Sequence, residues 1–310
     1  MTRCGVLLPS FDPFRTGDRR PVVAAARLAE DLGFDGVWVG DHLACPAPGL
    51  DATTCLAAAA AVTERVTLGF SVMLVGLRSA AWTAKQLIAL DALASGRLLL
   101  GVGVGGEFPD EFRAAGVPLR ERGAREEETL QVLPHLVTGR PVEHDGPKLK
   151  LSIPGLEPAM TAPPRVLVGG RGEPALNRAA RFGDAWLPMW LTPDELGRRA
   201  GRLAELADEH GRPCPELALL IGVHVDDDLA VASREADGHM QGQYRMPLDV
   251  VQRWSALGSA EQVAEYLQAY VAVGVRELVL MPLAREPLRQ YERLAEVSAH
   301  LHELTPGVAG

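Results

Sequence analysis

The sequence has no long hydrophobic run, and this absence limits where the protein can work. The apolar stretch Val6–Leu8 ends at Pro9, and Leu56–Val62 covers about seven residues, whereas a membrane-spanning helix needs about 20. We therefore expect no transmembrane segment, no export signal and a cytoplasmic location.

Cysteine and lysine are both scarce. The four cysteines show no C-x-x-C spacing, and no pair of histidines has metal-ligand spacing, so we expect neither a disulfide framework nor a metal site. Lys85, Lys148 and Lys150 are the only lysines, which leaves few candidates for a Schiff base. The net charge of −9 argues against nucleic acid or an anionic membrane as partner.

Strand and helix signals alternate along most of the chain. Short apolar runs predict eight strands, at Gly5–Pro9, Gly36–Val39, Val66–Val72, Leu98–Val104, Arg165–Gly169, Ala185–Leu187, Leu217–Val225 and Glu277–Pro282. Helical periodicity and caps predict helices over Pro21–Leu32, Asp51–Thr63, Ala80–Leu93, Glu121–Thr138, Pro174–Phe182, Thr192–His210, Ser259–Val273 and Pro287–His302. This series predicts an α/β fold, a (β/α)8 TIM barrel forming a single domain over residues 1–310. Val142–Ile153 breaks the alternation and predicts a hairpin inserted at the rim.

The fourth predicted strand runs into a glycine-rich loop. Leu98–Glu107 reads as a strand buried on both faces whose carboxyl end lets the backbone approach a ligand. Gly101, Gly103 and Gly106 also match G-x-G-x-x-G, the dinucleotide motif of Rossmann folds. That motif should open the chain and lead directly into a helix, but here it lies at the fourth strand and Pro109 follows. Glycines lining a barrel mouth are therefore the favoured interpretation.

Two further segments are candidate ligand contacts. Gly169–Gly172 follows the fifth strand and opens a helix, so its backbone N–H groups could cradle a phosphate, with Arg171 as a charged donor. A flexible βα loop is the alternative. Met240–Trp254 is non-periodic and precedes the last βα unit, which suggests either a lid over the substrate or, preferably, a packed insertion.

Two acidic residues and one histidine lie where a barrel places its active residues. Asp41-His42 ends the second strand, and the histidine could handle a proton or bind a cofactor ring, or could simply be satisfied by a neighbouring carbonyl. Glu107 could accept a hydrogen bond from a ligand or cap the next turn. Asp110 and Glu111 are expected at the surface.

Several segments share an order and a spacing that are informative as a set. They are Leu32–His42, Leu68–Val72, Asp91–Gly106 with its Ser95-Gly96-Arg97 turn, and Val168–Asp184 with Trp186 close behind. Together they resemble the bacterial luciferase-like family of flavin- and deazaflavin-dependent oxidoreductases. The likeness runs over nearly the whole chain and supports the barrel.

The resemblance implies a cofactor lying across the barrel mouth, with its ring near strands two to four and its phosphate near strands five and six. It also implies a bulge with a non-prolyl cis peptide at Ser71-Val72, against which the ring bends. His42 would handle a proton or stabilise the ring, and Glu107 would be a second acid or base. The cofactor-binding residues would be Asp41, Ser71, Val72, Gly103, Gly105, Gly106, Gly169, Gly170, Arg171 and Gly172.

Asp-His and Ser-Val at these positions look more like the family members that use coenzyme F420, a 5-deazaflavin, than those that use FMN. F420 carries hydride at C5 and reacts poorly with oxygen, whereas reduced FMN can oxygenate a substrate. We therefore expect F420-dependent hydride transfer to or from a small organic substrate. An FMN-dependent monooxygenase and a non-catalytic flavin-binding protein are the alternatives, and an unrelated lyase or aldolase barrel is disfavoured by the shortage of well-placed lysines.

One departure from the family bears on the substrate. Deazaflavin-dependent sugar-phosphate dehydrogenases of this family place Trp where this chain has Ala44, and they bind the substrate phosphate with lysines. A neutral or apolar substrate is therefore expected in place of glucose 6-phosphate. The family also suggests a homodimer.

Overall fold

Eight parallel strands close into a barrel in the computed structural model, which describes residues 2–17 and 21–304. The strands are β1 (Arg3–Leu7), β2 (Gly36–Val39), β3 (Thr67–Phe70), β4 (Leu98–Val102), β7 (Arg165–Gly169), β8 (Ala185–Leu187), β9 (Glu216–Val225) and β11 (Val275–Pro282). They pair in this order, and the pairings of β8 with β9 and of β11 with β1 close the ring. The predicted TIM barrel and all eight predicted strands are confirmed.

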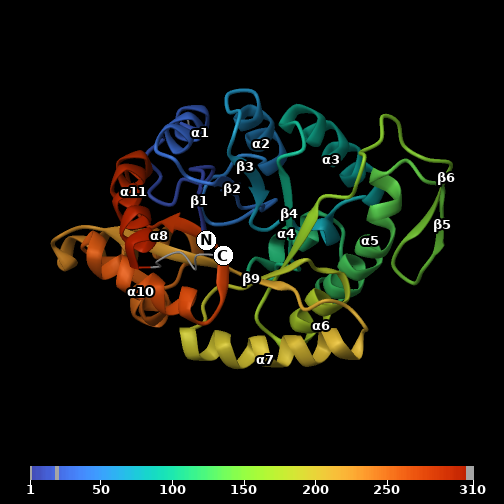
Figure 1. Cartoon of the computed structure of the whole chain (residues 1–310). Coiled ribbons are helices and arrows are strands. Elements are labelled where there is room, and N and C mark those ends of the chain that lie inside the picture. Colours follow the sequence, from blue (N-terminus) through green and yellow to red (C-terminus); the bar gives the residue numbers. More distant parts are fainter. Residues whose placement is uncertain (1, 18–20, 305–310) are drawn as a thin grey trace.

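Helices surround the strands and follow one another around the barrel (Figure 1). The ring consists of α1 (Val22–Asp31), α2 (Ala52–Ala60), α3 (Ala80–Ala94), α5 (Arg122–Val137), α6 (Glu173–Phe182), α7 (Pro193–Glu209), α10 (Ala260–Ala272) and α11 (Pro287–Leu304). The predicted start of α7 is confirmed: Thr192 Oγ1 accepts from the Glu195 N–H at 3.3 Å, and Glu195 Oε2 accepts from the Thr192 N–H at 2.8 Å. No helix in the described ranges is long and apolar enough to cross a membrane.

The predicted hairpin is also present. β5 (Val142–Asp145) and β6 (Lys150–Ile153) form an antiparallel pair beside α5, at the right edge of Figure 1. Glu128 on α5 holds its turn, because its carboxylate accepts hydrogen bonds from the backbone N–H groups of Lys148 and Leu149.

The segment between β9 and α10 corrects the prediction of a non-periodic stretch at Met240–Trp254. It contains α8 (Leu229–Tyr244), α9 (Leu248–Val251), the 3-10 helix η3 (Gln252–Trp254) and β10 (Ser255–Gly258), which pairs in parallel with the last four residues of β9. The helix α8 carries Gly238 and Gly242, each of which weakens helix propensity by about 1 kcal/mol and hid the helix in the sequence pattern.

The predicted third strand ends early. β3 stops at Phe70, and the Ser71-Val72 peptide bond is cis, as the family resemblance implied. Pairing resumes just beyond it, since Met73 donates its N–H to the Gly101 carbonyl at 2.8 Å. β4 likewise ends at Val102, before its predicted end at Val104. The 3-10 helices η1 (Val75–Leu77) and η2 (Leu119–Glu121) and the short helix α4 (Pro109–Ala114) lie in the loops after these two strands.

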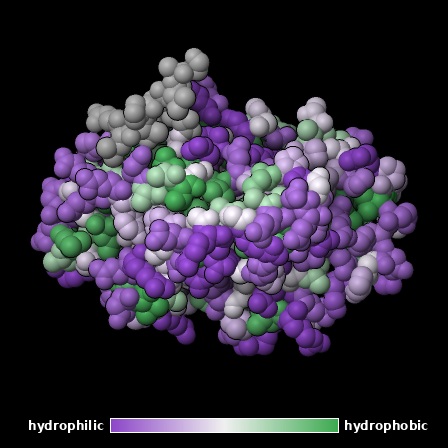
Figure 2. Space-filling view, turned by 60° about the horizontal axis from the view of Figure 1, so that its bottom comes forward, coloured by the Kyte–Doolittle hydropathy of each residue, from purple (hydrophilic) through white to green (hydrophobic). Residues whose placement is uncertain are grey.

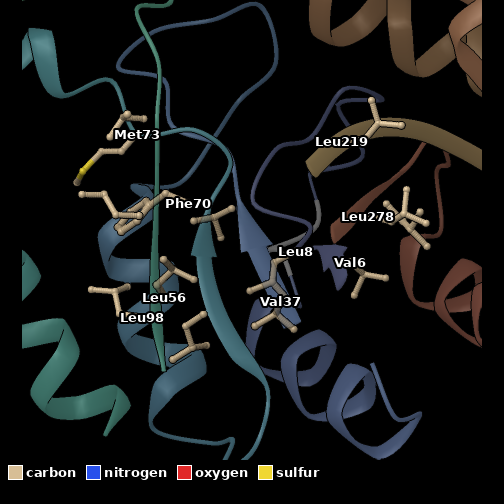
Figure 3. Packing of buried hydrophobic residues seen from close by; sticks show 14 of the residues in the cluster. Val6, Leu8, Val37, Leu56, Phe70, Met73, Leu98, Leu219 and Leu278 are labelled. Carbon is tan, nitrogen blue, oxygen red and sulfur yellow. The ribbon is translucent and has the colours of Figure 1, made fainter. Parts of the chain in front are cut away.

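Two apolar layers stabilise the barrel. One layer lies between strands and helices and includes Val37, Phe70, Leu278 and Leu56 of α2. In Figure 3 Phe70 and Leu56 are labelled on one side of the view and Leu278 on the other. The second layer fills the inside of the barrel, where Trp38 is fully buried. The alternation of side chains along each strand separates the layers, so that Leu219 of β9 faces the helices while Leu220 belongs to the inner group. Figure 2 shows a mostly hydrophilic face with hydrophobic residues in separate patches.

Candidate functional site

A cavity of about 1340 Å³, including the part open to solvent, lies at the carboxyl ends of the barrel strands. This is the end at which TIM barrels carry their active sites. The loop 9–17 after β1 and the helix α8 both contribute to its lining. The loop is held in place by the segment after β2, because Asp12 donates its N–H to the Pro48 carbonyl at 2.8 Å and Leu50 donates its N–H to the Ser10 carbonyl at 3.0 Å.

The structure gathers most of the predicted site residues around this cavity. Those that line it are Asp41, His42, Ser71, Val72, Gly103, Gly105, Glu107, Gly169 and Gly170. Three predicted cofactor contacts, Gly106, Arg171 and Gly172, are not among the lining residues. No group of three or more His, Cys, Asp or Glu side chains in the described chain could hold a metal ion.

His42 has a buried acidic partner. Its Nδ1 lies 3.2 Å from Oε2 of Glu111, whose side chain is fully buried, and the same oxygen accepts the Leu43 N–H at 3.2 Å. The prediction that Glu111 lies at the surface is therefore wrong, while its neighbour Asp110 is exposed. With Nδ1–H donating to the carboxylate, Nε2 is the ring nitrogen left to accept a proton.

Aromatic rings fix the plane of the His42 imidazole. The ring of Phe108 meets it edge to face at a centroid distance of 4.9 Å, and Phe11 lies on another side at 5.8 Å. Phe108 also stacks with Tyr244 of α8 at 6.4 Å. His42 and Tyr244 therefore face the same cavity, with Phe108 between them.

Asp41 connects two loops of the barrel mouth. One of its oxygens accepts the Leu74 N–H at 3.0 Å, and the other lies 2.6 Å from the Arg78 guanidinium. Both carboxylate oxygens thus hold the segment that follows the cis peptide. This arrangement gives Asp41 a positioning role towards Ser71 and Val72, since its oxygens already have partners.

Gly103, which directly follows β4, and Gly169, the last residue of β7, make room for Val72. A Cβ atom at Gly103 would lie 2.4 Å from Cγ2 of Val72, and one at Gly169 would lie 3.0 Å from Cγ1. Side chains at these two positions would displace Val72 from the cavity lining. Ser71, which is 6% exposed, brings a hydroxyl group that has no hydrogen-bond partner among the described residues.

Arg171 lies outside the cavity lining but beside it. Its guanidinium is 5.5 Å from the ring centroids of both Trp190 and Trp254, and it donates to the Trp190 carbonyl at 3.2 Å. Within the described chain, the backbone N–H groups of Arg171 and Gly172 donate no hydrogen bond, so both are available in front of α6. Whether they hold a phosphate stays a prediction.

Three polar residues of α8 line the cavity, namely His239, Gln243 and Tyr244. Gln243 and Tyr244 fall within Met240–Trp254, which the sequence offered as a lid or a packed insertion, whereas His239 was missed. Burial lowers the pKa of His239 to about 4 and raises that of the Tyr244 hydroxyl, an effect to which the nearby Glu107 carboxylate adds. The sequence did carry a signal for this helix face. Gly238 and Gly242 are four residues apart, and this spacing places two small residues on one face of a helix.

The sequence matches the family described as luciferase-like monooxygenase over residues 3–277, and the chain belongs to this family. It is 31% identical over 312 residues to an F420-dependent glucose-6-phosphate dehydrogenase from Beutenbergia cavernae, an alignment covering 89% of this chain and 91% of the relative. The relatives and structural neighbours include F420-dependent oxidoreductases and flavin monooxygenases.

Solved structures of this kind share the fold. An F420-dependent secondary alcohol dehydrogenase in complex with an F420-acetone adduct superposes with a TM-score of 0.84 at 20% identity, covering 97% of this chain and 99% of the other. The oxygenating constituent of 3,6-diketocamphane monooxygenase from Pseudomonas putida, in complex with FMN, gives 0.73 at 19% identity, covering 99% of both chains. At these identities the likeness shows the fold alone.

Proposed function

We propose that the protein is an F420-dependent oxidoreductase that transfers hydride to or from a small uncharged organic molecule. The observation that carries this proposal is the contact between His42 and the buried Glu111 at the wall of a largely apolar cavity. Interconversion of an alcohol and a carbonyl compound requires a proton acceptor beside the hydride path, and an imidazole oriented by a carboxylate is suited to that task. The relative of 31% identity that uses F420 supports the same cofactor.

The residues at the barrel mouth fit a flat tricyclic ring. Val72 presents an apolar surface to the cavity because Gly103 and Gly169 leave it space. Beside it, the unpaired hydroxyl of Ser71 offers a hydrogen bond to a polar ring edge. We assign the ring to this position, with Gly105 and Gly170 providing backbone close to it.

The start of α6 fits an anionic tail. The free N–H groups of Arg171 and Gly172 precede this ten-residue helix, whose dipole favours negative charge at that end. The Arg171 guanidinium lies 5.5 Å from the centroid of the Trp190 ring. We assign the cofactor phosphate to this loop, while Gly106 serves the backbone conformation next to Arg122.

When bound, a deazaflavin accepts or supplies hydride at C5. His42 then takes the proton of the substrate hydroxyl at Nε2 during oxidation, or returns it to the carbonyl oxygen during reduction. Glu111 keeps Nδ1 protonated and stabilises the positive charge that forms on the ring. Glu107, which is exposed at the cavity rim, is assigned as a second acid or base that exchanges protons with solvent.

Paired fluorescence titrations with F420 and FMN test the cofactor. We expect tight binding of F420 and weak binding of FMN; the reverse result, together with oxygen consumption in the presence of a flavin reductase, would replace the proposal by a monooxygenase.

Turnover is then measured with secondary alcohols and ketones. His42→Ala should lower kcat by at least about a hundredfold and keep F420 binding. The exposed His135→Ala is the matched control and should change neither value.

We also infer a homodimer in the cytoplasm and a single folding unit, on the strength of the family resemblance. Size-exclusion chromatography with light scattering tests the dimer. A single cooperative unfolding transition, coincident by fluorescence and circular dichroism, would support one domain.

A further inference from the structure

The wall of the cavity formed by α8 is built by close packing against the loop after β1. A Cβ atom at Gly242 would lie 1.9 Å from the Pro13 carbonyl oxygen, and one at Gly238 would lie 2.7 Å from the Phe14 ring. Because the two glycines let the loop lie directly on the helix, the residues that follow them, His239 and Gln243, come to line the cavity. Four residues apart, they share one face of α8.

Both side chains have hydrogen-bonding atoms without a partner. Gln243 is 3% exposed; its Nε2 reaches only the Cys45 sulfur, at 3.9 Å, and its Oε1 is unpaired in the described structure. Whichever way the amide is turned, one of its ends faces no protein partner. Nδ1 of His239 is likewise buried and unpaired. A buried polar atom left unpaired is destabilising, so a group that pairs with it binds favourably.

The helix α8 contributes no acidic residue, lysine or arginine to the described lining of the cavity. The described residues that line the cavity include four charged side chains, Asp12, Asp41, Glu107 and Arg285. Asp12 and Asp41 have partners within the protein, and the Arg285 guanidinium lies 4.7 Å from the Phe14 ring centroid. Neither His239 nor Gln243 has an ionic partner, so an ionised ligand group placed between them would lose its hydration without compensation.

We propose that His239 and Gln243 form a specificity subsite that binds a hydroxyl group of the substrate remote from its reacting carbon. A hydroxyl group can donate and accept at once, which matches an amide and a neutral imidazole. The substrate class is therefore an uncharged aliphatic alcohol or ketone that carries a second hydroxyl group. This inference rests on the proposed function for the reacting end, where His42 lies across Phe108 from Tyr244.

Three probes with one carbon skeleton separate the possibilities: pentan-2-ol, pentane-1,4-diol and 4-hydroxypentanoate. They end in a methyl, a hydroxymethyl and a carboxylate group. Binding to the F420-loaded protein is measured by ligand-observed NMR titration, which needs no turnover. We expect the diol to bind about tenfold more tightly than pentan-2-ol, and the carboxylate not to bind measurably.

The variants then locate the effect. Gln243→Leu should reduce the preference for the diol from about tenfold to about onefold, and His239→Phe should reduce it in the same direction. Gln241→Leu, an exposed position on the same helix, should keep the full preference. If Gln243→Leu fails to fold, His239→Phe alone decides the outcome.

The outcomes distinguish this inference from the proposed function. A diol preference that disappears in the variants supports the subsite even when none of the probes is turned over. Equal binding of diol and pentan-2-ol to the wild type, no binding of any probe, or a preference that survives both variants overturns the subsite. In that case turnover of simple alcohols with F420 would still support the proposed function.

Discussion

Oε2 of the fully buried Glu111 lies 3.2 Å from Nδ1 of His42, although the two residues are 69 positions apart in the chain. The carboxylate also accepts the Leu43 N–H, so a single acid fixes both the imidazole and the backbone beside it. Glu111 is not itself among the described lining residues of the cavity; it contacts His42, which is one of them, and acts through it. It is a positioning residue.

Glu111→Gln should lower kcat by about tenfold to a hundredfold with little change in KM or in the Kd for F420. The amide oxygen can still accept the Leu43 N–H, but it no longer balances positive charge on the imidazole. Steady-state kinetics with a secondary alcohol give kcat and KM separately, and thermal unfolding gives Tm. Asp110→Asn, at the exposed neighbour paired with Arg113, should leave kcat unchanged. A parallel loss of Tm and KM with unchanged kcat would instead indicate a structural role.

The barrel was predictable because its strands are apolar runs bounded by glycine or proline, and this pattern needs no knowledge of distant contacts. Glu111 was not predictable in the same way. It adjoins the exposed Asp110 in a six-residue helix, too short for periodicity to show which acid faces inward. Its partner His42 comes from the segment after β2, far away in the chain. The position of the cis peptide followed from the family resemblance and not from the local residues.

Val72 occupies space that the missing side chain of Gly103 leaves free, and this contact gives a test of the proposed ring position. Gly103→Ala should destabilise the protein by about 1–3 kcal/mol, because the new methyl group would lie 2.4 Å from Cγ2 of Val72. The displaced bulge should also weaken F420 binding by about tenfold. Urea unfolding and fluorescence titration measure the two effects.

Two further variants make this test specific. Gly201→Ala on α7 meets nothing within 4 Å and should stabilise the protein by about 0.5–1 kcal/mol through the better helix propensity of Ala. Adding Val72→Ala to Gly103→Ala should restore part of the lost stability, since the two side chains compete for one space. Purely additive losses would contradict the contact.

His239 makes stability depend on pH. Its folded-state pKa of about 4 lies below the ordinary value of 6.5, so the unfolded chain binds the proton more readily. The free energy of unfolding should therefore fall as pH drops from about 6.5 towards 4, by up to roughly 3 kcal/mol from this residue. Above pH 6.5 the residue should contribute no dependence. Urea unfolding of wild type and His239→Phe across this range gives the difference; parallel curves would show that His239 does not titrate in this way.

The same cavity predicts which phosphorylated substrate is rejected. Lys148 and Lys150 pair with Glu121 and Asp145, and Lys85 donates to the Glu157 carbonyl, so none of the three lysines lines the cavity. Arg285 is the only lysine or arginine among the described lining residues. A phosphate group of a substrate would find few charged donors in this cavity, and each charge-assisted hydrogen bond that it fails to make is worth about 1.5–3 kcal/mol.

With F420, kcat/KM for glucose 6-phosphate should therefore be at least about a hundredfold lower than for pentane-1,4-diol. Assays of this protein beside the Beutenbergia cavernae dehydrogenase, under identical conditions, make the comparison direct. Saturable turnover of glucose 6-phosphate by this chain would mean that arginines outside the described lining reach the substrate, and the neutral-substrate assignment would then be wrong.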